Sequence, residues 1–579
     1  MTVQTPVIRW ITAKQPAREA MDRYGNIPSI VAALLDGRGI GPGEASAFLN
    51  NRDHTRPLSD PFLLAGMGEA VARIRDAYAR AEKICIYGDY DADGLTAQAL
   101  LVTAFRASAW NFPDVCTYTP HREREGYGLH HDALAALARD GVRVIIAVDC
   151  GISNPAEIAR ISDAGVNVIV VDHHTVPESV PAASAVINPH LPGSAYPFRD
   201  LAGVGVAYAL VRALAASGAP FARPEPAVLN TLLAFVAIGT VADVVPLVGE
   251  NRLLVQAGLR ALQQTRHPGL LALCERAGIP VPTLDASHIS YGIAPRLNAP
   301  GRVRGVEDSY RLLVPTSDVE ARMAAVALDE ANRTRQAETQ RAIAEAFAMV
   351  ESSRLDETDR VLFLGDASWS IGIVGLVAAK LVERYHRPAL VYARGEGISR
   401  GSGRSIATFD LIAALERHAP LMQHYGGHPR AAGFTIANTN IAALHTALRD
   451  HAASLSDDDL LPTLHLDGQL NHADVSLSAC AAIAALAPFG HGNAEPLFLV
   501  PHVRVLDARR VGADGAHLSF TIGLETGENV RCIAFGAGSR EESLSRLREA
   551  DLAATLQRDV WRGDERLQLR VKDFRPVAE

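Results

Sequence analysis

Apolar and polar positions follow two alternating periods between residues 83 and 172. Short, strand-like apolar runs occur at 83–87 (KICIY), 142–148 (VRVIIAV) and 166–171 (VNVIVV). Runs with helical spacing, LTAQALLVTAFRA and NPAEIARISDAG, lie between them. Strands that alternate with helices in this way predict βαβ units and a parallel sheet.

The pattern changes twice further along the chain. Residues 316–353 contain neither Gly nor Pro and are rich in helix formers, which predicts a connecting helix on the order of 50 Å long. A second α/β pattern follows, formed by VLFLG, GIVGLVAAKLVERY and PALVYA, and then the glycine-rich loop GISRGSGRS. After Leu460, short strands separated by turn signals predict a small barrel or sandwich.

We therefore expect an α/β protein in several parts. A parallel-sheet domain is predicted at 59–315, a connecting helix at 316–354, a second α/β domain at 355–459 and a β-barrel domain at 460–579. Residues 1–58 form an N-terminal segment without an interpretable motif.

Each predicted strand of the first domain ends in acidic residues. Asp89, Asp91 and Asp93 follow the first strand, Asp149 follows the second, and the triplet at 172–174 (DHH) follows the third. Because the carboxyl ends of the strands line the ligand crevice of an open α/β sheet, these side chains should converge.

The stretch DYDADG also resembles the start of a calcium-binding loop. Such a loop closes with a bidentate Glu at its twelfth position, which is Leu100 here, and it follows a helix rather than a strand-like run. We therefore interpret DYDADG as an acidic catalytic loop.

The predicted crevice has the composition of a two-metal site. Asp243, in the apolar segment 231–248, and Asp172 add to its carboxylates. Their repulsion would raise their pKa values unless cations lie among them. Carboxylates with the imidazole of His173 favour Mn²⁺, with Mg²⁺ as the alternative. A single Asp after a strand is more often a helix cap. The two-metal interpretation therefore rests on the occurrence of acids at the ends of all three strands together with Asp243. Two such ions predict hydrolysis of a phosphoester.

Composition restricts the partners and the compartment. A net charge of −9 argues against a broad basic surface but leaves room for a local groove. Only four of the 56 basic residues are Lys, and Arg grips phosphate bidentately, although genomic base composition is the plainer explanation. The six Cys are scattered without a CxxC pair, which favours the cytoplasm and disfavours zinc. We read segment 231–248 as a buried helix, and no signal peptide is visible, so no membrane association is expected.

Together, the motifs resemble the DHH phosphoesterase superfamily, and specifically the RecJ branch of single-strand-specific 5′→3′ DNA exonucleases. The resemblance runs from about Ser59 to Glu579 through GDYDADG, EGYGL, VDCG, VDHH, GTVADVVPL, APRLNAPGR, GSGRS, GGHPRAAGF and PFGHGNAEP. It implies a DHH catalytic domain at 59–315, a DHHA1 substrate-binding domain at 355–459 and an OB-like nucleic-acid-binding domain at 460–579.

The resemblance also assigns roles to individual residues. The implied metal ligands are Asp89, Asp91, Asp93, Asp149, His173 and Asp243. Asp149 would bridge the two ions, and Asp89 would support the others. His174 would contact the scissile phosphate or protonate the leaving oxygen, and it completes a catalytic set with Asp91, Asp93 and Asp149.

A second group of residues is expected to hold the DNA. By resemblance, the backbone and its 5′ phosphate are held by Arg122 (or Arg124), Arg296, Arg302, Ser402, Arg404 and His428. Tyr90, Tyr127 and Trp369 are candidates for stacking on bases, although a single aromatic residue more often belongs to a core.

Two positions depart from the family pattern. Ser370 stands where RecJ proteins usually have the His of Trp-His-x-Gly, so any substrate contact of that His is weakened or replaced. Tyr87 stands where the pyrophosphatase branch carries a ligand His, which argues against pyrophosphatase activity.

The resemblance implies an enzyme that degrades single-stranded DNA to 5′-mononucleotides with two divalent ions, in DNA repair and recombination. The expected form is a monomer, with a helicase and a single-strand-binding protein as candidate partners. A phosphodiesterase of short oligonucleotides or cyclic dinucleotides is the main alternative. A catalytically silent scaffold is a further one, but such scaffolds lose ligand carboxylates, and this sequence keeps them.

Overall fold

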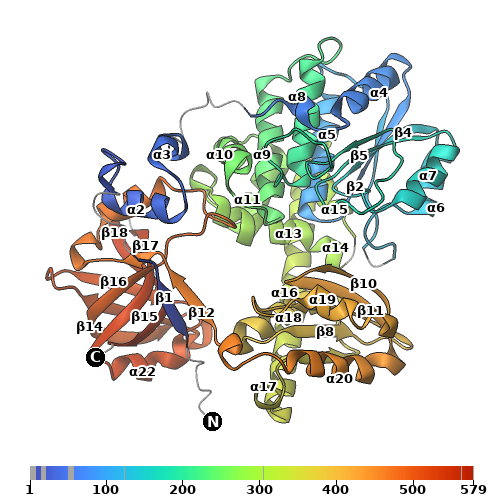
Figure 1. The fold of residues 1–579 in the computed structure, drawn as a ribbon. Helices are drawn as coiled ribbons and strands as arrows, with labels where there is room; N and C mark the ends of the chain where they lie inside the picture. Colours follow the sequence, from blue (N-terminus) through green and yellow to red (C-terminus); the bar gives the residue numbers. More distant parts are fainter. Residues whose placement is uncertain are drawn as a thin grey trace. The chain divides into compact units, whose positions relative to one another are not determined.

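The computed structural model describes residues 8–14, 21–49, 58–122, 124–303, 305–561 and 564–577. These residues form two compact units (Figure 1). The larger comprises Leu58–Leu460 with Gly490–Asn493, and the smaller comprises the described residues of Met1–Pro57, Leu461–Phe489 and Ala494–Glu579. The rest of the predicted N-terminal segment lies outside the described residues.

The larger unit begins with the predicted parallel sheet. Its strands are β2 (Lys83–Gly88), β3 (Val115–Tyr118), β4 (Val142–Val148), β5 (Asn167–Val171) and β6 (Ala185–Ile187). They lie in the order β3-β2-β4-β5-β6, and every neighbouring pair is parallel. After β2 the chain forms β3 on one side of β2, and it then crosses to form β4 on the other side of β2. The crevice at such a change of direction is the usual ligand site of an open α/β sheet.

Alternate residues of β2 and β4 enter two different cores. One core contains Ile84 and Ile86 with helices α4 (Met67–Ala79), α5 (Ala92–Arg106), α8 (Gly203–Ala216) and α9 (Pro226–Ala242). The other contains Cys85 and Tyr87 with α6 (His131–Arg139) and α7 (Pro155–Asp163). Because both faces are covered, β2 and β4 are apolar on both faces beyond Lys83 and Arg143 at their beginnings, rather than alternating.

The predicted buried helix at 231–248 is α9, and it ends earlier than the apolar run. Asp243 is its C-cap residue, and the chain turns before Pro246, which cannot donate a helical hydrogen bond. Further helices follow: α10 (Gly249–Gln263), α11 (Pro268–Ala277), α12 (Ala286–His288), α13 (Ala294–Asn298), α14 (Pro300–Val303) and α15 (Glu307–Leu313). Within the described residues, no helix has both the length and the apolar character needed to cross a bilayer.

The predicted connecting helix is α16 (Asp318–Ser353), 36 residues long. Ser317 caps its N-terminus, where Oγ accepts from the backbone N–H of Glu320 at 3.2 Å. Arg354 ends it in the left-handed conformation, with φ of 51°.

The second α/β domain contains a mixed sheet. Its strands are β7 (Leu362–Asp366), β8 (Ala389–Ala393), β9 (Ile398–Arg404), β10 (Met422–His428) and β11 (Ala431–Ala437), in the order β10-β11-β9-β8-β7. Only β7 and β8 are parallel. Its helices are α17 (Leu355–Thr358), α18 (Ile371–Tyr385), α19 (Leu411–Glu416) and α20 (Ile441–Ala452).

The prediction of a loop at GISRGSGRS was wrong, because this segment forms β9. Its glycines serve close packing inside the sheet rather than a turn. A methyl group at Gly403 would lie 2.7 Å from Cδ2 of Leu411, and one at Gly401 would collide with the ring of Phe434.

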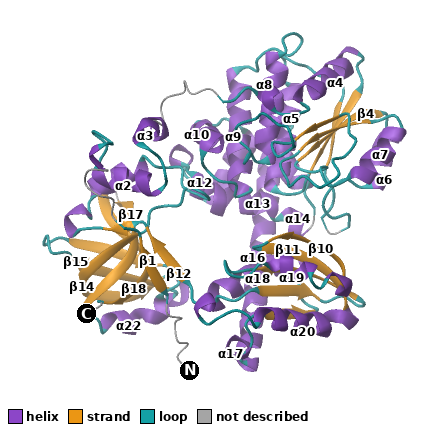
Figure 2. Ribbon diagram, in the orientation of Figure 1, coloured by secondary structure: helices purple, strands orange, loops and turns teal. Residues whose placement is uncertain are grey.

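The smaller unit is the predicted barrel (Figure 2). Its strands are β14 (Phe498–Val511), β15 (His517–Gly523), β16 (Asn529–Ala534), β17 (Glu549–Trp561) and β18 (Asp564–Pro576). The order β14-β15-β16-β18-β17 closes, because β14 also pairs with β17. The short β13 (Gly468–Gln469) adds to β14, and the helices are α21 (Leu477–Ala484) and α22 (Glu541–Ser545).

The N-terminal residues that carried no motif belong to this barrel unit. β1 (Arg9–Thr12) pairs in parallel with β12 (Thr463–Leu466). The helix α2 (Ser29–Gly37) contributes to the barrel core, and α3 (Pro42–Leu49) follows it. The five-part division made from the sequence stays a prediction.

Candidate metal centre and arginine cluster

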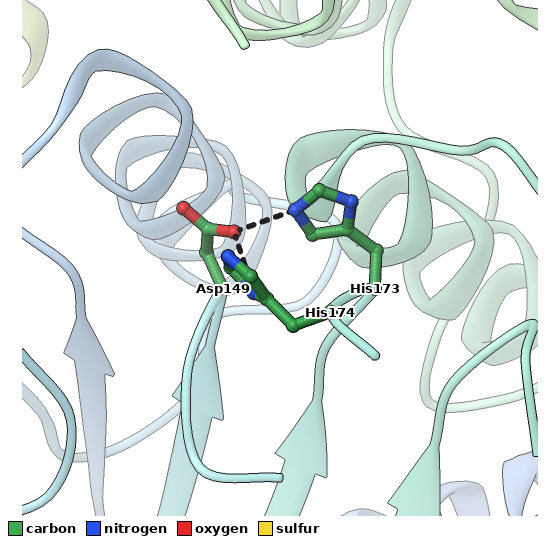
Figure 3. A group of neighbouring side chains, drawn as sticks. All are labelled: Asp149, His173 and His174. Atoms are coloured by element: carbon green, nitrogen blue, oxygen red, sulfur yellow. Dashed lines mark ion pairs between the residues drawn. The ribbon is translucent and has the colours of Figure 1, made fainter. Parts of the chain in front are cut away.

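The strand ends of the parallel sheet bring predicted metal ligands around His173. Its Nε2 lies 3.2 Å from Oδ1 of Asp149, 3.6 Å from Oδ2 of Asp243 and 4.0 Å from Oδ2 of Asp93. Figure 3 shows that the imidazoles of His173 and His174 both face the carboxylate of Asp149. The residues therefore converge as expected from their places in the sequence.

All six predicted ligands fall in three overlapping groups, in which the ligand atoms lie within 4.8 Å of one another. The groups are Asp89 with Asp91 and Asp149, Asp93 with His173 and Asp243, and Asp149 with His173 and His174. The first two have no residue in common, so each can supply three donor atoms of its own. The third connects them through Asp149 and His173.

Glycines make room for these carboxylates. A methyl group added at Gly94 would lie 2.7 Å from Cβ of Asp89. One added at Gly203 would lie 2.7 Å from Oδ1 of Asp149, and one added at Gly239 would lie 2.6 Å from Oδ1 of Asp93. Contacts that short would displace the carboxylates. The absence of side chains at the three glycines is therefore needed for the acids to lie in these positions.

Two acids of DYDADG also accept backbone hydrogen bonds at helix N-termini. Oδ1 of Asp91 accepts from the N–H groups of Asp93 (2.9 Å) and Gly94 (3.1 Å), which caps α5. Asp93 accepts from Gly203 (2.6 Å) and Val204 (3.0 Å) at the start of α8. Helix N-termini stabilise negative charge. The plainer interpretation of Asp91 as a helix cap is thus also correct for one of its oxygens.

Two residues of the site have an unusual backbone conformation. Asp149 has φ of 59°, and Val244, directly after Asp243, has φ of 62°. Non-glycine residues in this left-handed region cost roughly 1–3 kcal/mol, and such strain is concentrated at functional sites. At Asp149 the conformation directs the carboxylate toward His173.

The electrostatics of the cluster favour a bound cation. Burial first, and neighbouring carboxylates second, raise the pKa of Asp93 to about 7 and that of Asp243 to about 8, and raise the pKa of Asp89 and Asp149 well above the usual range. Burial and the neighbouring His174 lower the pKa of His173 to about 4, which leaves its imidazole neutral.

Three buried atoms of the cluster have no hydrogen-bond partner, namely Oδ1 of Asp89, Oδ1 of Asp149 and Nε2 of His173. Buried polar atoms are normally paired. Carboxylate oxygens and a neutral imidazole nitrogen are suitable ligands for Mn²⁺. The residues therefore fit divalent metal.

His174 is held from two sides. Its Nδ1 lies 2.8 Å from Oδ1 of Asp172 and 3.2 Å from the hydroxyl of Tyr127. Burial alone would lower its pKa, but the contact with Asp172 outweighs burial and raises the pKa to about 9. Asp172 also accepts backbone hydrogen bonds from His173, His174 and Ile152. Asp172 thus positions the histidines and falls in none of the three ligand groups.

Four arginines gather beside the metal cluster. Burial first, and then the charges of Arg122, Arg335 and Arg404, lower the pKa of Arg302 to about 10. Nη1 of Arg302 donates to the carbonyl of Gly372 at 2.7 Å. Of the alternatives Arg122 and Arg124, only Arg122 is among the charges that act on Arg302. Like charges so close together favour an anion among them.

A pocket lies beside two members of this arginine cluster, Arg302 and Arg335. It lies between the end of α9 and helices α13, α14 and α16, and its lining includes Val244, Asn298, Arg302 and Arg335. The buried atoms Asn298 Oδ1, Arg302 Nε and Arg335 Nε have no hydrogen-bond partner. Arg335 was missed from the sequence, because it lies inside a run of helix formers without a motif of its own.

Some of the other predicted substrate residues contact the arginine cluster, and one is exposed at a strand end. Arg404 donates to Oγ of Ser402 at 3.1 Å, and the Arg122 guanidinium lies 5.1 Å from the ring centre of Tyr90. His428 is exposed at the end of β10. Ser402 and Tyr90 therefore contact two members of the arginine cluster, Arg404 and Arg122 respectively.

One prediction needs correction. Trp369 is 3% exposed, and its indole N–H donates to Glu345 at 2.7 Å. No face of this ring is open to a base, so Trp369 packs in the core. The guanidinium of Arg296 is paired with the buried Asp329 at 3.0 Å and donates to the carbonyl of Gly292, and its contact with DNA stays a prediction.

The two departures from the family pattern lie apart in structure. Ser370 precedes α18 and makes no capping hydrogen bond, and its buried Oγ has no partner. Tyr87 is fully buried, and its hydroxyl donates to the carbonyl of Gly128 at 3.1 Å. Tyr87 takes no part in the three ligand groups.

Comparisons with known proteins agree with this arrangement. Residues 83–240 match the N-terminal domain of the DHH family, residues 358–454 match the DHHA1 domain, and residues 466–573 match the RecJ OB domain. The single-stranded-DNA-specific exonuclease RecJ of Bacillus subtilis (strain 168) is 35% identical over 95% of this chain and 68% of its own length. The protein of the same name from Dickeya dadantii (strain 3937) is 36% identical over 90% of this chain and 92% of its own length.

The chain belongs to the RecJ family. Its structure matches that of RecJ from Thermus thermophilus in complex with Mn²⁺, with a TM-score of 0.83 and 29% identity over 99% of this chain and 80% of the other. RecJ from the same organism in complex with Mg²⁺ matches with a TM-score of 0.76 and 28% identity over 99% and 79%. Proteins of the RecJ family have thus been solved with either metal, and the acidic cluster of this chain could hold such an ion.

Proposed function

We propose that this chain is a metal-dependent exonuclease that hydrolyses single-stranded DNA from its 5′ end to 5′-mononucleotides, in DNA repair and recombination. The observation that carries the proposal is the convergence of six ligand side chains in two donor groups without a common residue. The RecJ relatives named above are single-stranded-DNA-specific exonucleases, which supports DNA as the substrate.

The two donor groups would each hold one divalent ion. Asp89, Asp91 and Asp149 would hold one, and the three residues Asp93, His173 and Asp243 the other. The imidazole favours Mn²⁺, and Mg²⁺ is also compatible with the carboxylates. Bound ions would supply Lewis-acid polarisation of the scissile phosphate and a lower pKa for the attacking water.

The side chains beside the cluster would orient the substrate and move one proton. His174 would contact the scissile phosphate. Because its Nδ1 is engaged with Asp172, Nε2 is the atom that would donate a proton to the leaving 3′-oxygen. The Tyr127 hydroxyl also donates to the carbonyl of Asp149 at 3.1 Å, and so fixes His174 relative to Asp149.

The arginine cluster would select the 5′ end. Arg122, Arg302 and Arg404, with Ser402, would bind the 5′ phosphate through charge-assisted hydrogen bonds, and Arg335 would add a fourth guanidinium. A phosphate held at a fixed distance from the metal cluster allows only the terminal nucleotide to be removed, which supplies the polarity. Three further predictions concern the state of the protein in the cell: it is a monomer, it lies in the cytoplasm, and it acts with a helicase or a single-strand-binding protein.

The decisive experiment is digestion of 5′-phosphorylated single-stranded DNA in Mn²⁺, compared with matched duplex and 5′-blocked strands. Wild type should release 5′-mononucleotides from the open 5′ end of single strands. Asp149→Asn should abolish release, since Asn tolerates the left-handed backbone but lacks the charge. The control is Asp140→Asn, a largely exposed acid paired with Lys83 at 3.6 Å.

Two outcomes would contradict the proposal. If wild type leaves long strands intact but cleaves dinucleotides, the chain is a phosphodiesterase of short substrates. If Asp149→Asn retains wild-type release, the acidic cluster does not catalyse the reaction.

A further inference from the structure

Two thiols lie side by side in neighbouring strands of the parallel sheet. Cys85 in β2 and Cys116 in β3 are register partners, and both pack into the core cluster that contains Leu134 and Ile158. Neighbouring strands are about 4.8 Å apart, which lies within the roughly 4.4–6.8 Å between Cα atoms that disulfides span. The backbone is therefore already placed for a disulfide.

The two thiols differ in a way that suits stepwise oxidation. Cys85 is fully buried, whereas Cys116 is only half-buried. A hydrogen bond from Cys85, assisted by the charge of Lys83, lowers the pKa of Cys116. The same hydrogen bond, together with burial, raises the pKa of Cys85. Reactive cysteines are partly exposed, electropositive in their surroundings and rich in thiolate, and redox-sensitive ones often have a second Cys nearby.

The chain offers an internal comparison. Of its six cysteines, only Cys116 and Cys480 are not buried. The thiol of Cys480 donates to the carbonyl of Leu556 at 3.5 Å, and burial raises its pKa. Exposure alone therefore does not distinguish Cys116, but its thiol neighbour and its thiolate character do.

We propose that Cys85 and Cys116 form an oxidative modification site, in which a peroxide oxidises Cys116 and Cys85 then closes an intramolecular disulfide. The thiolate of Cys116 attacks one oxygen of the peroxide and becomes a sulfenic acid, while the other oxygen leaves as hydroxide or alkoxide. The sulfur of Cys85 then displaces the sulfenic hydroxyl, which leaves as water with the Cys85 proton. The two sulfurs together lose two electrons, and the peroxide gains them.

The disulfide would connect an edge strand to the strand that leads into DYDADG. Cys85 lies four residues before Asp89, and β3 leads to the loop that carries Arg122. Neither thiol takes part in the proposed DNA hydrolysis, so the inference does not depend on the proposed function.

The test is treatment of the full chain with hydrogen peroxide, followed by alkylation of free thiols and mass mapping of the peptides. Wild type should lose alkylation at Cys85 and Cys116 together, should yield one cross-linked peptide pair, and should recover both thiols in dithiothreitol. Cys480→Ser should behave like wild type, whereas Cys116→Ser should leave Cys85 reduced. Alkylation of Cys116 after peroxide, with no cross-link, would overturn the proposal.

A second variant tests the role of Cys85 without relying on the disulfide itself. In Cys85→Ser, whose hydroxyl keeps a hydrogen-bond donor beside Cys116 but cannot form a disulfide, peroxide should convert Cys116 to sulfinic acid, a product that dithiothreitol does not reverse. In wild type, closure of the disulfide should reduce that product several-fold. Equal yields of sulfinic acid in the two proteins would show that Cys85 does not trap the intermediate.

Discussion

In the larger unit, the metal cluster and the arginine cluster serve one proposed site but are assembled differently. The carboxylates and His173 come mainly from strand ends of one sheet and the helices that follow them. The arginines come from four separate segments: Arg122 after β3, Arg302 on α14, Arg335 on α16 and Arg404 on β9. The first cluster depends mainly on the topology of a single sheet, whereas the second requires segments from both sides of the 36-residue helix α16 in the sequence to come together.

The metal cluster and the arginine cluster also differ in the surroundings of their charged groups. The acids lie where three glycines leave room for them, and Asp91 and Asp93 accept hydrogen bonds at helix N-termini. The arginines keep part of their hydrogen bonding unsatisfied, with buried Nε atoms of Arg302 and Arg335 unpartnered. We therefore expect changes in the acids to affect chemistry and metal binding, and changes in the arginines to affect substrate binding alone.

The largest effect should come from Asp149, which belongs to two of the three overlapping ligand groups. Asp149→Asn should lower kcat by about four orders of magnitude, the scale found for essential members of a catalytic unit. A titration should find two Mn²⁺ per wild-type chain and one in Asp243→Asn, which removes a ligand of a single group. One Mn²⁺ per wild-type chain would show that the two groups do not act as separate sites.

A smaller effect is expected from the residue that positions His174. Asp172→Asn should lower kcat roughly 10–100-fold, the usual cost of removing a partner that orients a ligand, while the Mn²⁺ stoichiometry stays at two. Tyr127→Phe should cost less, because Asp172 still contacts His174. Steady-state kinetics with a parallel metal titration separates the two effects, and loss of Mn²⁺ in Asp172→Asn would contradict the positioning role.

The arginine cluster should respond in KM. Arg335→Gln should raise KM for 5′-phosphorylated DNA roughly 10- to 100-fold, because a charge-assisted hydrogen bond contributes roughly 1.5–3 kcal/mol, and kcat should change little. The matched control is Arg341→Gln on the same helix, whose side chain is 58% exposed and pairs weakly with Glu345. An unchanged KM in Arg335→Gln would remove Arg335 from the substrate site.

The smallest effect concerns stability in the absence of metal. Burial and neighbouring carboxylates raise the pKa of Asp243 in the folded state from its ordinary value of 3.8 to about 8. The folded state therefore retains a proton that the unfolded state loses, and stability falls as pH rises from about 4 to about 8. In EDTA at pH 8, Asp243→Asn should raise the unfolding temperature by a few degrees. Scanning calorimetry of both proteins at pH 4 and pH 8 checks the sign: the variant should gain stability over wild type at pH 8 and little at pH 4, and an equal difference at the two pH values would contradict the prediction.

The contrast between the clusters also explains what the sequence could predict. Strand, acid and helix follow one another directly in KICIYGDYDADG, so local pattern and strand order together place the ligands. The role of Asp172 as an orienting residue did not follow from the pattern, because every strand-end acid looks alike before hydrogen bonds are known.

The arginine cluster was harder to predict, because its parts are far apart in the chain. Arg335 lies in a long helix with no local signal, and the ion pair of Arg296 with Asp329 joins residues 33 positions apart, which no local pattern reveals. The segment GISRGSGRS, predicted to be a loop, contains strand β9. The prediction failed because the sequence alone does not distinguish glycines that allow close packing in a strand from glycines in a turn. The N-terminal residues pair with a strand more than 450 positions away, which no local pattern reveals.

The three glycines around the acids have a consequence for protein engineering. At Gly239 an added methyl group would fall 2.6 Å from Oδ1 of Asp93, inside a helix where alanine is otherwise the better residue. Gly239→Ala would thus occupy the volume of the centre and leave the chemical identity of all six ligands intact. An inactive form for trapping a DNA complex can therefore be made by filling space, with the charge of the site unaltered.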